Sequence, residues 1–369
     1  MKNWFPQPLT VAFALVAAMT LGTASAARRV GIPPGLLPDA QDLEMVEMAV
    51  MPGVDEGALR LEDMETELSG TPAPARFAVG HAVNISPDSA GTWETLSDGS
   101  RLWRMRIVSA GAQNLSLGLD RFDLPRGGKF WIHDRDGAWV QGPYTRGDQN
   151  SKGGLWTAVT LGEELVVELH LPAGNSRAEL EITSVNHGYR GFEQYEKLGA
   201  VKRGSCNVNV VCPEGNRWAD QIRSVARTTI ADGSDLYLCT AQLINNTAED
   251  ETPYLYTAGH CLYNEDGDAM DPTTLVAYWN YQTATCADRF GGSLSQNQSG
   301  STLIAESWVS IYDLGLDFGL LLLDADPDPD FNVFFVGWDA RDVAPKSSVT
   351  IHHPQGHQKS ISFDDDPAT

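Results

Sequence analysis

The sequence has little positive charge. It contains 26 Lys and Arg against 49 Asp and Glu, and its formal net charge at pH 7 is −23. The imbalance is greatest from residue 204 onward, where 7 basic residues face 24 acidic ones. Proteins that bind nucleic acid need basic surfaces to neutralise phosphates, so this composition argues against a nucleic-acid partner. Acidic charge of this kind more often provides solubility than steering of a substrate.

Long apolar runs are missing after the first 26 residues. Those residues have the pattern of a secretory signal peptide, with Lys2, the apolar run LTVAFALVAAMTLG and the small-residue motif ASA at 24–26. This apolar run is too short for a membrane span. We therefore expect a signal peptide at 1–26, no membrane span, and secretion to the periplasm or the extracellular space, where disulfides persist.

Cysteine is missing from the first 205 residues. The five cysteines all follow that point, at Cys206, Cys212, Cys239, Cys261 and Cys286. An odd number of cysteines in a secreted chain leaves one thiol without an intramolecular partner.

Strand patterns dominate the chain, and long helices are not expected. Residues 27–75 are rich in Pro and Gly, and we interpret them as a flexible lead with at most one short helix near 40–50. Residues 76–192 contain runs of period-two alternation, such as LWRMRIVS, NLSLGL and ELVVELHLP, separated by short turns. One buried and one wet face per strand predicts an antiparallel β-sandwich.

Four histidines lie in this β-rich unit without the spacing of metal ligands, and we expect structural roles for all of them: His81, His133, His170 and His187. Residues 193–203 have the character of a linker, and the Lys202–Arg203 pair is a candidate processing site. Residues 204–369 are again strand-rich, which predicts a second all-β unit, a barrel or a sandwich.

The stretch YTAGHC at 256–261 has the form of a presented catalytic histidine. A general-base histidine must direct one ring nitrogen at a nucleophile and the other at a carboxylate. A disulfide on Cys261 would fix the turn, and we expect Cys239, 22 residues upstream, to be its partner. We assign Asp317 as the carboxylate and expect it to be buried, since an apolar strand follows it; Asp313 is the alternative.

From 204 to about 363 the chain resembles the lysyl endopeptidases, secreted bacterial serine proteases of the trypsin fold. The matching stretches are GSCNVNVVCPEG, LCTAQLINNTA, YTAGHC, YWNYQTATC, DFGLLLL, FNVFFVGWDARD and IHHPQGHQKSIS. The resemblance implies a double β-barrel, with His260 as general base, Asp317 as its orienting acid, and cleavage after Lys or Arg. It also implies disulfides Cys239–Cys261 and Cys212–Cys286, and a pro-region that corresponds to residues 76–192.

The pattern departs from the family at the nucleophile. In this fold the order is His, Asp, Ser, so the serine must follow residue 317. The candidates Ser347, Ser348, Ser360 and Ser362 are not in the glycine-flanked loop that an oxyanion hole requires. Cys206 also lacks the late partner that the resemblance implies. We therefore expect the second barrel to be truncated, and the serine and the lysine-reading acid to lie beyond Thr369.

Two other functions are open at the level of sequence. A truncated or inactive protease homologue could bind peptides or cell-surface polymers through its β-sandwich. A metal-binding protein is suggested by His352, His353 and His357 in IHHPQGH, but strand alternation would place the first two on opposite faces, and no carboxylate or cysteine is suitably spaced. We expect no metal and no cofactor.

Overall fold

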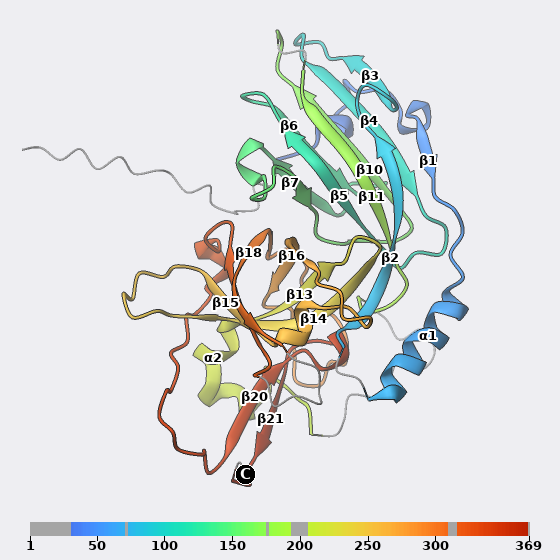
Figure 1. The fold of residues 1–369 in the computed structure, drawn as a ribbon. Coiled ribbons are helices and arrows are strands. Elements are labelled where there is room, and N and C mark those ends of the chain that lie inside the picture. Colours follow the sequence, from blue (N-terminus) through green and yellow to red (C-terminus); the bar gives the residue numbers. More distant parts are fainter. Residues whose placement is uncertain (1–30, 71–72, 175–176, 193–205, 309–315, 368–369) are drawn as a thin grey trace, which may run out of the picture.

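The structure, a computed structural model, describes residues 31–70, 73–174, 177–192, 206–308 and 316–367 (Figure 1). Strand accounts for 41% of the residues and helix for 14%, so the all-β prediction is confirmed. An N-terminal unit of two packed sheets lies at one end of the molecule, and a barrel lies below it (Figure 1). The predicted signal peptide and the Lys202–Arg203 linker lie outside the described residues.

The first sheet of the N-terminal unit has six strands in the order β1-β4-β10-β6-β7, with β3 also paired to β4. Their bounds are β1 Met48–Val50, β3 Thr92–Thr95, β4 Arg101–Val108, β6 Lys129–His133, β7 Val140–Tyr144 and β10 Glu164–Leu171. The opposing layer comprises β2 Ala75–Ile85, β5 Asn114–Asp123, β8 Leu155–Trp156, β9 Thr160–Leu161 and β11 Glu179–Gly188. The 3-10 turn η3, Arg146–Asp148, follows β7.

The alternating apolar residues of the sequence form the core between these layers. Leu115, Leu117 and Leu119 of β5 are buried against Leu165 and Leu169 of β10. We expected the outward-facing side chains of each strand to be exposed to solvent, and this expectation is wrong for β4 and β10. Arg104 and Glu168 on that outer face are buried as well, because the lead segment covers them and supplies polar partners, including the Gln41 carbonyl and the Gly35 N–H.

The lead itself is more ordered than predicted. Its described part contains the 3-10 turns η1, Pro34–Leu36, and η2, Leu43–Met45, followed by β1 and the α-helix α1, Glu56–Ser69. The short helix expected near 40–50 corresponds to the 3-10 turn η2, whereas the longer helix α1 was not predicted. Local signals do mark α1: the Asp55 side chain accepts from the Ala58 N–H at 3.1 Å, and Gly70 ends the helix with φ 72°.

The C-terminal unit is built around a nearly closed barrel with a trypsin-like fold. Strands run in the order β16-β13-β14-β15-β19-β18, and β17 lies beside β16. Their bounds are β13 Val225–Ala231, β14 Asp235–Ile244, β15 Tyr254–Thr257, β16 Asp271–Trp279, β17 Asn297–Ser299, β18 Ser301–Ser307 and β19 Phe318–Leu323. The Gly300 N–H donates to the Leu275 carbonyl at 2.8 Å, which brings the start of β18 against β16.

The remaining elements surround the barrel. A 3-10 turn and a short helix precede it, η4 Pro213–Trp218 and α2 Ala219–Ser224. A separate three-stranded sheet has the order β12 Val208–Asn209, β21 Ser360–Asp364, β20 Ser348–His352, and its first strand precedes the barrel in the chain while the other two follow it. The turns η5 Gly259–Leu262, η6 Pro329–Phe331 and η7 Pro354–Gly356 complete the chain. Within the described ranges no second barrel closes, and no helix has the length and apolar character to cross a membrane.

The two units share one sheet. Strand β2 pairs with β11 in the N-terminal unit and with the first residues of β14 in the barrel, so a twelve-stranded sheet crosses the expected domain boundary. Phe77 and Phe192 of the N-terminal unit are buried in one cluster with Leu236, Val276 and Tyr278 of the barrel. The units therefore pack through a common apolar core.

Candidate active site

A sharp turn after β15 presents His260. Strand β15 lies between β14 and β19, and the chain then enters η5 through Ala258 and Gly259. A Cβ atom on Gly259 would lie 2.8 Å from the Ser307 carbonyl oxygen and 3.1 Å from that of Phe318. Only glycine fits this close approach of three backbone segments, which explains the small residue before the histidine.

Asp317 stands opposite His260, immediately before β19. The His260 Nδ1 atom lies 2.8 Å from Asp317 Oδ2, and the His260 main-chain N–H donates to Oδ1 at 2.9 Å. Partial burial acts to raise the pKa of Asp317, but hydrogen bonds from the backbone and ring of His260 outweigh it and hold this pKa below its ordinary value. The carboxylate is therefore an ionised acceptor that fixes the ring and its tautomer.

Asp317 is more exposed than predicted. Its side chain is 48% exposed and that of His260 is 27% exposed. The reason lies in its position: β19 begins only at Phe318, so the buried leucines Leu321 and Leu323 lie beyond the carboxylate and do not enclose it. The alternative acid, Asp313, falls outside the described residues.

Aromatic contacts missed by the sequence analysis hold this turn. Tyr263 stacks on Trp308 with ring centroids 4.8 Å apart, and its hydroxyl donates to Glu306 at 2.7 Å. Tyr256 stacks on Phe318 at 6.5 Å. Each contact joins the segment around His260 to the strands on either side of Asp317. The only sequence signal was the tyrosines that flank TAGHC on both sides.

The cysteines are arranged as the resemblance implied. Cys239 of β14 is bonded to Cys261, directly after the histidine, and Cys212 is bonded to Cys286. Cys206 is exposed and has no disulfide partner among the described residues. The Cys239–Cys261 disulfide joins the His260 turn to β14.

Two groups that contain histidine bear on the metal hypothesis. The sulfur atoms of Cys239 and Cys261 and one ring nitrogen of His260 lie within 4.8 Å of one another, but the disulfide removes both thiolates as ligands. In IHHPQGH, the buried His353 donates from Nδ1 to the His357 carbonyl at 2.9 Å. Burial lowers the pKa of His353 well below its ordinary value, as expected for a structural, neutral imidazole.

His260 lines a cavity of about 1570 Å³ between the barrel and the N-terminal unit. Its walls include Met64 and Glu67 of α1 and His353 of the C-terminal segment. No serine is among the described residues that line it. Of the candidate serines, Ser347 and Ser348 are exposed elsewhere, Ser360 is buried, and the Ser362 hydroxyl donates to Asn207 at 2.9 Å.

Comparison with known proteins identifies both parts of the chain. A family model described as the lysyl endopeptidase N-terminal domain matches residues 54–187, and one described as the lysyl endopeptidase C-terminal domain matches residues 201–369. The curated lysyl endopeptidase of Pseudomonas aeruginosa is 31% identical over 217 residues, which cover 56% of this chain and 45% of that relative. The chain thus matches less than half of the relative's length. With both of its units matched, the chain is a lysyl endopeptidase-like protein.

Proposed function

We propose that this chain carries the base and the orienting acid of a secreted serine endopeptidase that cleaves peptide bonds after Lys or Arg. The observation that carries the proposal is the pairing of His260 with both oxygens of Asp317, at 2.8 and 2.9 Å, beside a large cavity. The similarity of both units to lysyl endopeptidase domains supports a peptidase. The preference for lysine rests on that similarity.

In this mechanism a serine hydroxyl attacks the peptide carbonyl carbon, and His260 accepts its proton at Nε2. The tetrahedral intermediate then collapses, His260 returns the proton to the leaving amine, and an acyl-enzyme remains for hydrolysis by water. Asp317 keeps the Nδ1 proton in place and stabilises the imidazolium that forms. Two hydrogen bonds to one carboxylate hold the ring and its backbone together, which reduces the motion that would misdirect Nε2.

We propose that the nucleophilic serine is none of the four candidates Ser347, Ser348, Ser360 and Ser362. None of Ser347, Ser348, Ser360 and Ser362 lines the cavity beside His260. We further propose that residues 1–26 direct secretion, that the N-terminal unit is a pro-region, and that Lys202–Arg203 is a processing site.

Labelling of the full-length protein with a fluorophosphonate probe tests the serine mechanism, since the probe reacts only with an activated serine. We expect labelling of the wild type, loss of labelling in His260→Ala, and retention in His170→Gln, a matched histidine change in the sandwich. Hydrolysis of peptide amides with Lys, Arg or Leu before the scissile bond tests specificity. A folded full-length protein that is not labelled would overturn the catalytic function in favour of a non-catalytic, peptide-binding one.

A further inference from the structure

Helix α1 is attached to the molecule mainly by charge. The residue that it buries is Asp63, whereas Leu61, Met64 and Leu68 are 60%, 50% and 80% exposed. An amphipathic surface helix normally buries its apolar stripe and exposes its acids. Since α1 does the reverse, its attachment depends on the partners of Asp63.

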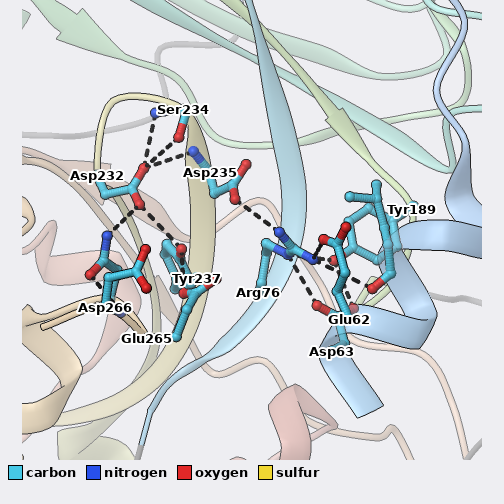
Figure 2. A network of polar contacts seen from close by, with 12 residues as sticks. Glu62, Asp63, Arg76, Tyr189, Asp232, Ser234, Asp235, Tyr237, Glu265 and Asp266 are labelled. Carbon is cyan, nitrogen blue, oxygen red and sulfur yellow. Dashed lines mark hydrogen bonds and ion pairs between the residues drawn. The ribbon is translucent and has the colours of Figure 1, made fainter. Parts of the chain in front are cut away.

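Asp63 is surrounded by donors from β2 and from the segment that follows β11 (Figure 2). Its Oδ1 atom accepts from Arg76 Nε at 3.0 Å, and its Oδ2 atom accepts from the Tyr189 hydroxyl at 2.8 Å. Arg190 lies 3.3 Å from Oδ2. A carboxylate this buried is stable only because each oxygen has such partners.

Arg76 carries this contact across to the barrel. While its Nε atom faces Asp63, its Nη1 atom lies 3.1 Å from Asp235 Oδ2 at the start of β14, and its Nη2 atom lies 2.9 Å from Glu62 (Figure 2). Burial acts to lower the pKa of Arg76, and the hydrogen bonds to Glu62 and Asp235 more than reverse this effect. One guanidinium thus joins α1, β2 and β14.

The backbone at the same place completes the connection. Arg76 lies opposite Tyr237, and Val79 lies opposite Asp235, in the antiparallel pairing of β2 with β14. The Gly80 N–H donates to the Ser234 carbonyl just beyond the strand. Farther along β14, the same edge pairs with β15, which leads to His260. Strand β2 therefore completes an edge of the barrel that β15 covers only in part.

We propose that α1 is a latch that holds the N-terminal unit on the barrel as a separable partner. Asp63 positions the guanidinium of Arg76 against Asp235, and this contact fixes the addition of β2 to the edge of β14. The shared apolar core around Phe77 supplies contact area, while the charged contact selects the register and the partner. The two units then remain a non-covalent pair when the chain between them is cut. This inference does not depend on catalysis.

Cleavage of the whole chain tests the latch. A recognition sequence for a site-specific protease is inserted between Ala200 and Val201, the purified chain is cut, and association of the two pieces is followed by size exclusion over a dilution series. We expect the wild-type pieces to elute together at micromolar concentration. Asp63 lies on α1 and does not contact β14 directly. The pieces of the Asp63→Asn protein should dissociate at a concentration at least about tenfold higher than the wild-type pieces do.

Asp235→Asn should weaken association similarly, and the double variant should lose less than the sum of the two single losses, because both act through Arg76. Glu65→Gln, an exposed acid on the same helix, and Asp268→Asn, an exposed acid on the barrel, are the matched controls. Separation of the wild-type pieces at micromolar concentration would overturn the proposal. So would an Asp63→Asn protein that associates as tightly as Glu65→Gln.

Discussion

The main-chain N–H and the ring Nδ1 of His260 both bond to the carboxylate of Asp317, one to each oxygen. A single aspartate therefore fixes the backbone of the η5 turn and the orientation of the imidazole that the turn presents. The position of the His260 ring and its tautomer both depend on the Asp317 carboxylate, so removal of the negative charge of Asp317 affects both.

Asp317→Asn should reduce turnover by about four orders of magnitude in a protein that also carries the nucleophile, because the amide can donate to Nδ1 and stabilise the wrong tautomer. Steady-state hydrolysis of a lysyl peptide amide measures the effect. Asp326→Asn, which changes an exposed acid, should leave kcat within about twofold of the wild type. If Asp317→Asn lost less than about tenfold in turnover, Asp317 would not be a catalytic residue.

The pKa of Asp317 should be measurable directly. A 13C NMR titration of the carboxyl carbon should give a midpoint below 3.8, the ordinary value. In His260→Ala the ring hydrogen bond is lost while burial remains, so the midpoint should rise; in His81→Ala it should not move. A midpoint in the wild type at or above 3.8 would contradict the assigned hydrogen bonds.

The same shift sets the sign of a stability effect. Because the folded-state pKa of Asp317 lies below the unfolded one, its ionised form stabilises the folded protein above the unfolded value. That contribution is lost as pH falls through the folded-state pKa. Urea unfolding at a series of acidic pH values should therefore show a smaller acid-induced loss of stability in Asp317→Asn than in the wild type.

The sequence was informative where local chemistry decides the structure. The alternation at Leu115, Leu117 and Leu119 identified a core face, because a strand places every second side chain on one side. The pairing of His260 with Asp317 could be anticipated because a general-base histidine needs a carboxylate to orient its ring. The first inference depends on a short spacing, and the second depends on residue types, since His260 and Asp317 lie 57 residues apart.

The parts that sequence missed depend on contacts distant in the chain. Nothing near Arg104 indicates that residues 35–41 would cover it, so it was assigned to a wet face. The helix α1 was overlooked because its buried residue is Asp63, whose partners Arg76 and Tyr189 lie 13 and 126 residues away. The sheet that joins the two units likewise depends on the pairing of β2 with β14, which no local pattern predicts.

The disulfide beside the active-site turn should stabilise the fold. Replacing both Cys239 and Cys261 by Ala removes a link between residues 22 apart, and we expect the free energy of unfolding to fall by about 3 kcal/mol. Urea unfolding of the whole chain measures the change. Cys206→Ala, at an exposed free thiol, should have no measurable effect. Equal effects of the two changes would show that the link does not stabilise the barrel.

The N-terminal unit offers a sharper test of packing at Gly35, where the lead meets the outer face of the first sheet. The Gly35 N–H donates to Oε2 of the buried Glu168 at 2.8 Å, and His133 Nε2 lies 3.0 Å from Oε1 of the same carboxylate. A Cβ atom on Gly35 would lie 1.9 Å from that Oε1. Because real contacts are never so close, Gly35→Ala must displace either the lead or the carboxylate.

We expect Gly35→Ala to lower the free energy of unfolding by about 1–3 kcal/mol, the usual cost of overpacking. Gly53→Ala is the matched control, since a Cβ atom there would meet nothing within 4 Å. Urea unfolding compares the two, and hydrogen exchange at residues 34–41 locates the change. If both variants were equally stable, the lead would not rest on Glu168, and the burial of Arg104 and Glu168 would need another explanation.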